Sequence, residues 1–416
     1  MSYINKNLKI ILLFIILLLV FYRSPHIFLN GRFAAEEGAF FFRNSFLNGP
    51  LSGLFYVYEG SPYFNFWANL SSVLASFFPL EYAPLVTVYM AFLVQLYLLV
   101  FIIFSESHFL INFKDKVLIS LLVLIAPPMV ASVWLNTLTS QVYFTILTIL
   151  IFFQKEIRDN FFSKISPAII FISGLTSILP CVLLPFFGYK YINNKNKFNH
   201  LNFISLLIPT LVQFFLYIYV KISNLELLLD GPRYILSINK LINYFYNTVV
   251  KSFLGRDLTQ KIYFDYIENQ YKFIIILIIL ILLVFFLRKI FNKLISDKTS
   301  LYLLIFFIIQ SILAIYAAKF EEVQGRYSVI PGMLLIFLIF RMYQIIPYWY
   351  KGVFAILLSL SLITGAYEYK FNNKYPQFLA CIEDCPNWKD EVQKWKENNN
   401  YELKIWYYPK WTMKLN

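Results

Sequence analysis

Histidine and cysteine are scarce in this chain of 416 residues, with only three of each. His26, His108 and His200 are scattered and have no metal-ligand spacing, so we predict no metal centre built on them. The chain also lacks a glycine-rich phosphate loop, a nucleophile elbow and a dinucleotide fingerprint. No periodic repeat indicates a solenoid. These absences leave little support for nucleotide-dependent or hydrolase-type chemistry.

Charge is scarce as well: only 14% of the residues are charged, whereas 59% are hydrophobic and 20% aromatic. This composition excludes an ordinary soluble domain. Residues 273–287 contain no polar side chain, and comparable runs recur at about the 15–20 residues that cross ~30 Å of hydrocarbon. Strands of a β-barrel would alternate instead. The sequence therefore predicts an all-α, polytopic membrane helical bundle.

Hydropathy predicts about 11 helices. They are expected near residues 8–22, 84–104, 116–135, 138–153, 165–174, 177–189, 203–221, 272–288, 301–318, 331–346 and 352–368. No small-residue cleavage site follows the first run, so we interpret it as a retained helix and not as a signal peptide.

The net charge of +13 would favour nucleic acid binding in a soluble protein. If the N-terminus is cytoplasmic, the short loops that carry most of the lysines are cytoplasmic too. The C-terminus is then external. This distribution of lysines is the positive-inside pattern. We therefore predict that the chain lies in a lipid bilayer and that it does not bind nucleic acid.

The orientation depends on dividing residues 165–189 into two half-length helices around residues 173–176. Lysines at both ends of this segment favour such a hairpin, which needs neighbouring helices or a wet cavity to cover its broken backbone. The alternative is a single crossing. With one span fewer, every later loop would lie on the opposite side of the membrane.

This topology predicts a membrane domain at residues 1–368 and a small tryptophan-rich external tail at 369–416. Two long segments, 23–83 and 222–271, are also external. The first is expected to hold interfacial helices at 32–47 and 64–78. In the second of these, the side chains expected to face water are Asn65, Asn69, Ser72 and Ser76. Those expected to lie on the membrane surface are Phe64, Phe66, Trp67, Leu70, Val73, Leu74 and Phe77. An ordinary spanning helix at 64–78 is the alternative.

The sequence Ala35-Glu36-Glu37-Gly38 places two carboxylates just after the first apolar run. Ionised groups are costly in hydrocarbon, so adjacent acids at the membrane edge invite a chemical explanation. Consecutive helical residues point about 100° apart, so the two acids cannot both project into one pocket. One could serve as a general base while the other holds structure. A solvated pair at a helix start, stabilised by the helix dipole, is the other interpretation.

Glu36 is expected to share a helical face with Arg32, Phe40 and Arg43, so the two arginines are candidates for a substrate cavity. The polar turn at 136–141 adds Asn136 and Gln141 as candidates, although capping and helix–helix hydrogen bonds would also explain it.

A short external loop at 319–327 is the candidate anion site. Arg326 could bind a phosphate with two hydrogen bonds, and Lys319 would act as a point charge beside it. Tyr327 completes this predicted site. The alternative is a salt bridge from these cations to Glu321 or Glu322 in an ordinary loop.

The tail holds Cys381 and Cys385, whose spacing permits a local disulfide in an oxidising compartment, although free thiols would also fit. Cys181 stands in an apolar stretch and is expected to be a small packing residue. Four tryptophans and mixed charges indicate that the tail is a folded cap or lies against the bundle.

On these residues the chain resembles the GT-C superfamily of integral-membrane glycosyltransferases. The resemblance is carried by the first helix, the acidic pair Glu36-Glu37, the interfacial segment 64–78 and the following bundle. It extends to a bacterial branch in which an Ala-Glu-acidic-Gly motif accompanies an external Arg-Tyr pair, here Arg326-Tyr327. The branch also has a tryptophan-rich tail, here with Trp388, Trp406 and Trp411.

The resemblance implies an inverting transfer of a sugar from a polyprenyl-phosphate donor to an envelope glycan or glycolipid acceptor. The reaction would take place on the outer face of a bacterial cytoplasmic membrane. In the superfamily the first acid of the pair usually assists the acceptor, which favours Glu36 over Glu37. The leading acid there is often Asp, and this chain has Glu in both places. Whether Mg²⁺ or Mn²⁺ assists is left open.

Two other functions stay open at this point. An O-antigen-type polymerase also joins lipid-linked glycans in an aromatic helical bundle. A flippase or transporter of lipid-linked glycans would be built on ionisable groups deep within its helices, often in repeated halves, and the sequence shows neither.

Overall fold

The computed structural model describes residues 2–58, 63–157, 160–222, 236–268, 288, 290–318, 323, 325–369, 387–406 and 411–416. The predicted span at 272–288 lies outside this part of the chain except for Arg288. Lys319 and both tail cysteines, Cys381 and Cys385, lie outside it too.

The chain forms two compact units. Unit 1 comprises residues 1–107, 131–230 and 370–416, and unit 2 comprises residues 108–130 and 231–369. The helices of unit 1 are α1 (Ser2–Arg23), α2 (Pro25–Asn30), the π-helix η1 (Glu37–Phe42), α3 (Arg43–Leu54), α4 (Phe66–Ser76), α5 (Ala83–Phe104), η2 (Ala131–Val133), α7 (Ser140–Phe152), α8 (Phe161–Thr176), α9 (Ile178–Cys181), α10 (Leu184–Asn193), α11 (Lys197–Ile222) and α18 (Trp388–Glu397).

In the described part of unit 2 all the named elements are helices. Its elements are α6 (Phe113–Ile125), α12 (Ile238–Tyr244), the π-helix η4 (Phe245–Val250), α13 (Lys251–Glu268), α15 (Lys298–Ala317), η5 (Gly325–Ser328), α16 (Val329–Ile345) and α17 (Tyr348–Tyr367).

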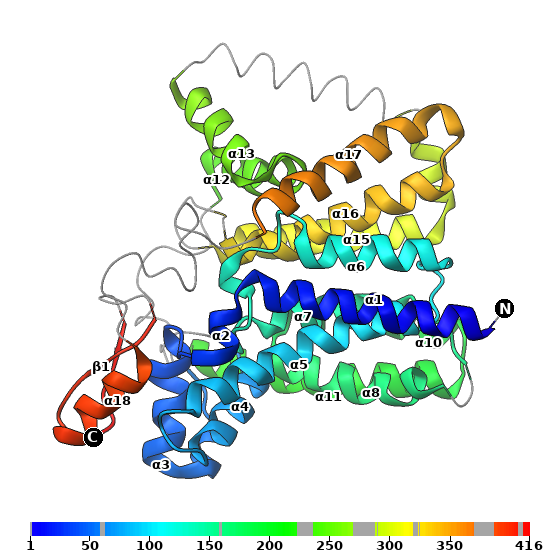
Figure 1. Ribbon diagram of the computed structural model, residues 1–416. Helices are drawn as coiled ribbons and strands as arrows, with labels where there is room; N and C mark the ends of the chain where they lie inside the picture. Colours follow the sequence, from blue (N-terminus) through cyan, green and yellow to red (C-terminus); the bar gives the residue numbers. More distant parts are fainter. Residues whose placement is uncertain are drawn as a thin grey trace. The chain divides into compact units, whose positions relative to one another are not determined.

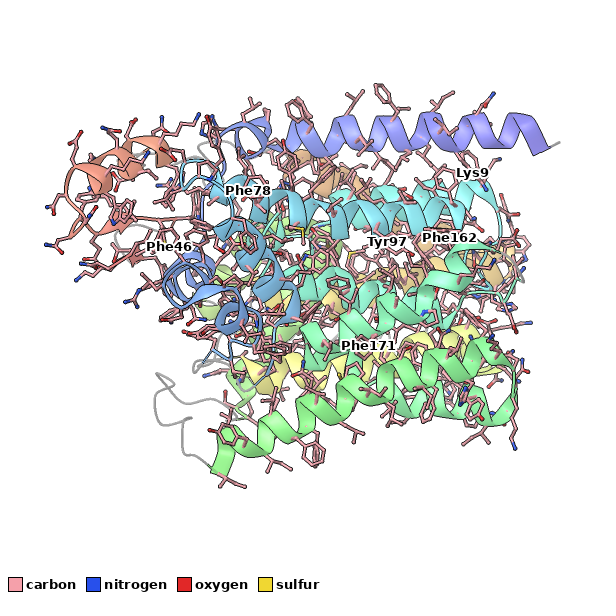
Figure 2. All side chains as sticks on the ribbon, turned by 90° about the horizontal axis from the view of Figure 1, so that it is seen from below. Lys9, Phe46, Phe78, Tyr97, Phe162 and Phe171 are labelled. Atoms are coloured by element: carbon pink, nitrogen blue, oxygen red, sulfur yellow. The ribbon has the colours of Figure 1, made fainter. Side chains whose placement is uncertain are left out.

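Five described helices are long and apolar enough to cross a membrane: Ala83–Phe104, Lys197–Val220, Lys298–Ala317, Gly325–Ile345 and Tyr348–Tyr367. The bent pair Phe161–Thr176 and Ile178–Asn193 would make six if it counts as one span. Many of their large apolar side chains point outward, as Figure 2 shows for unit 1, and would be poorly placed in water. The predicted all-α class is confirmed, and the length and composition of these helices fit a membrane-embedded protein.

The break predicted within 165–189 is present, because α8 ends at Thr176 and the chain bends by 119°. The Ser177 hydroxyl accepts a hydrogen bond from the backbone N–H of Leu179 and so caps the next helix. Gly174 lies against α11, where a Cβ would come within 2.7 Å of Pro209. Neighbouring helix thus covers the break, as a broken helix in a membrane requires.

The single helix predicted at 116–135 is wrong. Helix α6 stops at Ile125 because Pro127 and Pro128 follow. A residue that precedes proline avoids the helical region, and Ala126 accordingly has ψ 147°. The hydropathy prediction missed this boundary because the residues that follow Ile125 are also largely apolar.

The interfacial helix predicted at 32–47 begins later and extends further. Ala35 has φ +49°, which a right-handed helix does not allow, so the helix starts at Glu37. It continues through Arg43 as α3 to Leu54, with a kink at Gly49, where φ is +83°.

Helix α4 is too short to span a membrane, but its polar face was predicted wrongly. Asn65, Asn69 and Ser72 are buried within the protein and do not face water. The Asn69 amide donates to the carbonyls of Leu54 and Tyr56, and Asn65 donates to that of Leu138. Phe77 is exposed. The polar face therefore binds neighbouring backbone. The predicted apolar face is divided, because Phe64 and Val73 are buried as well.

Residues 387–406 and 411–416 form a small structure that we call the C-terminal cap. It consists of α18 and a hairpin of β1 (Leu403–Lys404) and β2 (Thr412–Met413), which pair antiparallel with Leu403 opposite Met413. Within unit 1 the cap and α2–α4 lie at the end of the long helices where α1 finishes, and the N-terminus is at the other end (Figure 1).

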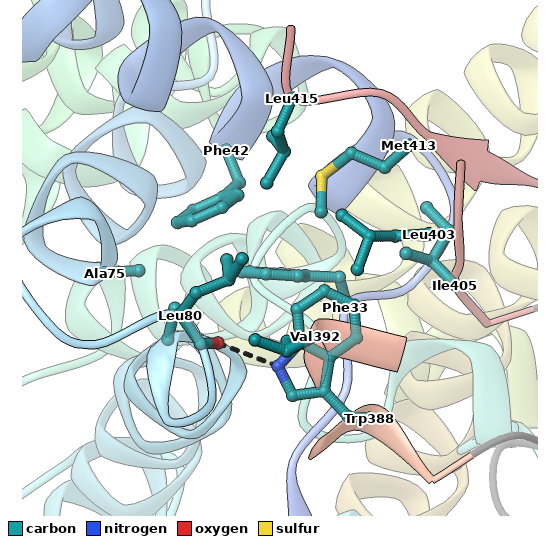
Figure 3. Packing of buried hydrophobic residues seen from close by; sticks show 11 residues of the cluster. Phe33, Phe42, Ala75, Leu80, Trp388, Val392, Leu403, Ile405, Met413 and Leu415 are labelled. Atoms are coloured by element: carbon teal, nitrogen blue, oxygen red, sulfur yellow. Dashed lines mark hydrogen bonds between the residues drawn. The ribbon is translucent and has the colours of Figure 1, made fainter. Parts of the chain in front are cut away.

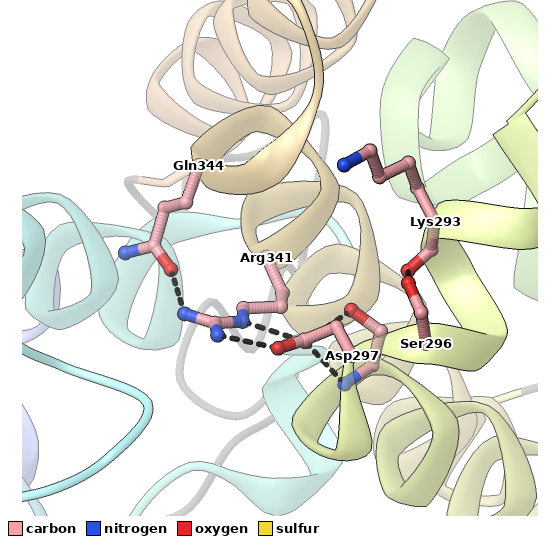
Figure 4. A network of polar contacts seen from close by, with 6 residues as sticks. Lys293, Ser296, Asp297, Arg341 and Gln344 are labelled. Atoms are coloured by element: carbon pink, nitrogen blue, oxygen red, sulfur yellow. Dashed lines mark hydrogen bonds and ion pairs between the residues drawn. The ribbon is translucent and has the colours of Figure 1, made fainter.

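In unit 2, Asp297 joins the start of α15 to α16. Its carboxylate accepts from the backbone N–H of Ser300, which caps α15, and from Nε and Nη2 of Arg341 at 2.9 and 2.7 Å (Figure 4). Arg341 Nη1 also donates to Gln344. Both partners of the ion pair are largely buried, at 12% and 21% side-chain exposure, so the pair is less screened than a surface pair.

We predict that Asp297→Ala lowers the free energy of unfolding by about 2–3 kcal/mol, because it removes a helix cap and leaves Arg341 without its carboxylate. Thermal unfolding in detergent measures the change. Ser296→Ala, one residue away and exposed, is the control and should stay within about 0.5 kcal/mol of the parent. Equal effects in both variants would contradict this role of Asp297.

Candidate functional site

The acidic segment, residues 33–43, begins as an extended strand and turns into a helix. Ala34 forms a parallel β-bridge with Trp406 of the cap. Ala35 then adopts the left-handed conformation, and Glu36 precedes the first turn of η1. The sharp change of direction at Ala35 separates Arg32 and Phe33 from the helical residues that follow. The predicted helical face shared by Arg32 and Glu36 is therefore wrong.

Glu37 is buried, with 2% of its surface exposed, and its carboxylate is held from three sides. Oε1 accepts hydrogen bonds from the hydroxyl and the backbone N–H of Thr137, and Oε2 accepts from the backbone N–H of Ala34. Thr87 of α5, whose hydroxyl donates to the carbonyl of Pro84, interacts with the carboxylate as well. Glu37 thus connects the acidic segment to the turn before α7.

Burial raises the pKa of Glu37 above its ordinary value, although the hydrogen bonds from Thr137 and Ala34 and the interaction with Thr87 oppose the rise. A buried carboxylate that gains no cation is stabilised in its protonated form. Thr137 is itself fully buried, so solvent does not reach this side of the acidic segment.

Glu36 has different surroundings. It is half-buried, as are Phe40 and Arg43, which follow it at helical spacing on the same side of η1 and α3. Among the described residues none forms a hydrogen bond with the Glu36 carboxylate. The prediction that the two acids point apart is consistent with this arrangement: Glu37 faces the interior and Glu36 the outward face.

Half-buried aromatic rings gather around Phe40, which follows Glu36 at helical spacing. The ring of Phe40 is 4.7 Å from that of Tyr58 and 6.0 Å from that of Trp411, which belongs to the cap. Phe41, on the inner side, extends this group with an edge contact to Tyr56 at 5.4 Å. We call Phe40, Tyr58 and Trp411 the aromatic row.

The turn at 136–141 holds Glu37 in place but offers little open polar surface. Asn136 is buried, and its side chain accepts from the backbone N–H of Leu138 while its carbonyl accepts from Ser140. It therefore caps its own turn. Gln141 is half-buried and donates to the hydroxyl of Tyr63 at 3.3 Å, so it is the better placed of the two candidates to meet a ligand.

Both candidate arginines are bound to the cap. Arg43 Nε donates to the carbonyl of Lys414 at 2.8 Å, and the guanidinium of Arg32 lies 5.6 Å from the ring centre of Trp406. Burial lowers the pKa of Arg32 to about 10, against the attraction of Glu391, and the side chain stays cationic at neutral pH. These contacts use the arginines to attach the cap to the acidic segment.

The predicted anion loop lies in unit 2. Arg326 is exposed and lies over the ring of Tyr327 at 5.6 Å, whereas Lys319 is outside the described residues. Tyr327 packs against Tyr244, Ala314, Ala318 and Val323. Helix α12 holds the loop: Lys240 Nζ donates to the carbonyl of Ala318, and Asn243 accepts from the backbone N–H of Val323, each at 2.9 Å.

Sequence reasoning missed Thr137, Thr87, Trp406 and Lys240 as parts of these sites. Thr87 and Lys240 gave a weak signal, a polar residue within or beside an apolar helix. The sequence analysis named Trp406 as part of the tail but did not predict its pairing with the acidic segment, because that pairing joins distant parts of the chain. Within the described residues no three His, Cys, Asp or Glu side chains gather as a metal site.

Comparison with protein families, curated proteins and solved structures gives no match to this chain. The functional argument therefore depends on the site itself.

We predict that the stability contributed by Glu37 depends on pH. Because its pKa in the folded chain is raised above the ordinary 4.5, its contribution is complete below that pH and is lost as the pH rises through the folded pKa. The melting temperature of the parent should therefore fall relative to that of Glu37→Gln as the pH rises above 4.5. Thr137→Val removes a hydroxyl donor to the carboxylate and should enlarge the effect. A difference that does not change with pH would contradict the assignment.

Proposed function

We propose that this chain is an inverting membrane glycosyltransferase of the GT-C type, which moves a sugar from a polyprenyl-phosphate donor to a glycan or glycolipid acceptor. The observation that carries the proposal is the unequal setting of the two acids. Glu37 is buried and hydrogen-bonded, whereas Glu36 is half-buried on the face that also carries Phe40. One acid is thereby available to a substrate while its neighbour fixes the backbone.

In the proposed reaction Glu36 is the general base. Its carboxylate takes the proton of an acceptor hydroxyl, whose oxygen attacks the anomeric carbon of the donor from the face opposite the phosphate. The bond from that carbon to the phosphate oxygen breaks, and polyprenyl phosphate leaves with the bonding electrons. The products are the glycosylated acceptor with inverted configuration, polyprenyl phosphate and a proton on Glu36.

Glu37 is a positioning residue in this mechanism. A general base must lie within about 2.6–3.2 Å of the proton that it removes, and small displacements reduce the rate steeply. The hydrogen bonds from Thr137 and Ala34 fix the first turn of η1, which follows Glu36 directly. The pair of adjacent acids is therefore explained by two different tasks.

The donor phosphate needs a cation as negative charge develops on the leaving oxygen. Arg326 is the proposed residue, because it is exposed and its guanidinium can bind a phosphate through two parallel hydrogen bonds. Lys319 is proposed as a second cation on the basis of the sequence alone. Any requirement for Mg²⁺ or Mn²⁺ is tested by adding EDTA to the assay.

The acceptor sugar is proposed to stack on the aromatic row. Aromatic rings present broad apolar faces, and Tyr58 and Trp411 add polar groups that can bond hydroxyls. Phe40 of the row follows Glu36 at helical spacing, so the row is proposed as the acceptor surface next to the base. Gln141 and Tyr63 are further polar groups of the same unit.

We predict that Glu36→Gln lowers kcat by about 1,000-fold, because an amide of the same shape cannot take the acceptor proton. The measurement is sugar transfer from polyprenyl-phosphate sugars in detergent, at equal folded yield and with donor binding measured separately. Glu37→Gln is the matched control. It should lose activity less, through displacement of Glu36 and not through loss of the base.

Full turnover in both glutamine variants would contradict the catalytic role of the pair. If the parent protein transfers no sugar from any donor, the result would favour an O-antigen-type polymerase or a flippase over the glycosyltransferase. The polymerase would extend a lipid-linked glycan in the same preparation, and a flippase would move it across vesicles without forming a bond.

We predict that Trp411→Ala raises KM for the acceptor by about tenfold, which corresponds to about 1.4 kcal/mol of lost stacking. The kcat and the donor KM should change little. Trp411→Phe keeps a ring at this position and should restore most of the affinity. An equal rise in KM for both substrates would show a general loss of structure and contradict acceptor stacking.

A further inference from the structure

The C-terminal cap is built directly onto the residues that precede the acids. The backbone N–H of Trp406 donates to the carbonyl of Phe33 at 3.0 Å, and Trp406 pairs with Ala34. These contacts end one residue before the left-handed turn at Ala35 and two residues before Glu36. The cap thus fixes the strand from which the acidic helix departs.

Phe33 is the centre of the interface between the cap and the acidic segment. Its fully buried ring stacks on Phe42 at 4.3 Å and meets the edge of Trp388 at 5.4 Å. Trp388 Nε1 in turn donates to the carbonyl of Leu80 at 2.8 Å (Figure 3). Both ends of the acidic segment, Phe33 and Phe42, therefore belong to the same hydrophobic core as the cap.

Gly38 allows the cap to approach the first turn of η1. A Cβ at this position would lie 2.6 Å from the Cβ of Phe33 and 3.2 Å from Cδ1 of Ile405. A side-chain methyl of the cap thus contacts the backbone two residues after Glu36. Gly38 lies within η1, so its backbone conformation is one that other residues can also adopt. Glycine is needed at this position because any side chain would prevent the close packing.

Glu391 organises the cap itself. It is fully buried and accepts from the Lys404 backbone N–H at 3.0 Å, the Tyr401 hydroxyl at 2.8 Å and the Lys394 ammonium at 3.0 Å. Burial would raise the pKa of Glu391, but these donors hold it below its ordinary value. The carboxylate thereby keeps β1, with Ile405 and Trp406 after it, in a fixed position relative to α18.

We propose that the C-terminal cap positions Glu36, with Trp388 and Ile405 as positioning residues that act through Phe33 and Gly38. The cap contacts the segment on both sides of Glu36, whose own side chain keeps part of its surface exposed. Contacts that bracket the acid in this way fix its backbone without blocking a substrate. The inference rests on the proposed function for the role of Glu36, but its structural part can be tested without activity.

The experiment compares Trp388→Ala and Trp388→Phe in the full-length chain by hydrogen–deuterium exchange and by transfer kinetics. Trp388→Ala should raise amide exchange across residues 36–42 by about tenfold or more, since it frees the packed end of the segment. The kcat should fall by about 100-fold, with the donor KM within about threefold of the parent, because misplaced catalytic groups affect the chemical step. Trp388→Phe keeps the ring against Phe33 and should restore most of both values.

Ile405→Val is the second variant, in case Trp388→Ala does not fold. It deletes the methyl group that contacts Gly38, and core changes of this size cost about 1 kcal/mol. Val392→Ala is its matched control, because Val392 is equally buried in the cap core but lies on α18. Exchange at residues 37–39 and kcat should respond more to Ile405→Val than to Val392→Ala.

Faster exchange in the cap with unchanged exchange at residues 36–42 would overturn the inference, whatever the activity. Faster exchange at 36–42 without a change in kcat would show that the cap orders the segment but does not position a catalytic group. If the parent transfers no sugar, the exchange result still decides the structural part, while the proposed function fails separately.

Discussion

The hydrogen bonds that Thr137 and Ala34 donate to Glu37 are the constraint on which the acidic segment depends. A carboxylate taken from water without a cation is stable only if its oxygens are satisfied, and three groups of unit 1 do this here. Because Glu37 cannot turn outward without breaking these bonds, its neighbour Glu36 has to point the other way. The chemistry proposed for Glu36 is thus a consequence of how Glu37 is buried.

The apolar helices were predictable, because membrane-length hydrophobic runs leave the backbone few alternatives to a helix. The helices α5, α11, α15, α16 and α17 lie close to the ranges that hydropathy predicts. Failures came where a local backbone rule overrides composition. Pro127 and Pro128 end α6, and the left-handed Ala35 delays the acidic helix.

The surroundings of individual side chains were much less predictable. Asn65 and Asn69 seemed suited to water, but the carbonyls of Leu54, Tyr56 and Leu138 need donors, and the amides supply them. Likewise Arg32 and Arg43 stand near the acids in sequence but bind the cap in space. A polar side chain near a membrane needs a hydrogen-bond partner. That partner can be water, a substrate or another part of the protein, and only the three-dimensional structure distinguishes these cases.

The pairing of Arg43 with Lys414 joins positions 371 residues apart. A ribosome makes the acidic segment early and the cap among the last residues of this sequence. All the intervening helices must therefore be synthesised before Phe33 and Gly38 meet their partners. Until then the segment lacks Trp388, Ile405 and Trp406, so an incompletely synthesised chain would carry the acids without the structure that surrounds them. The order of synthesis thus delays assembly of the site until the rest of the bundle is complete.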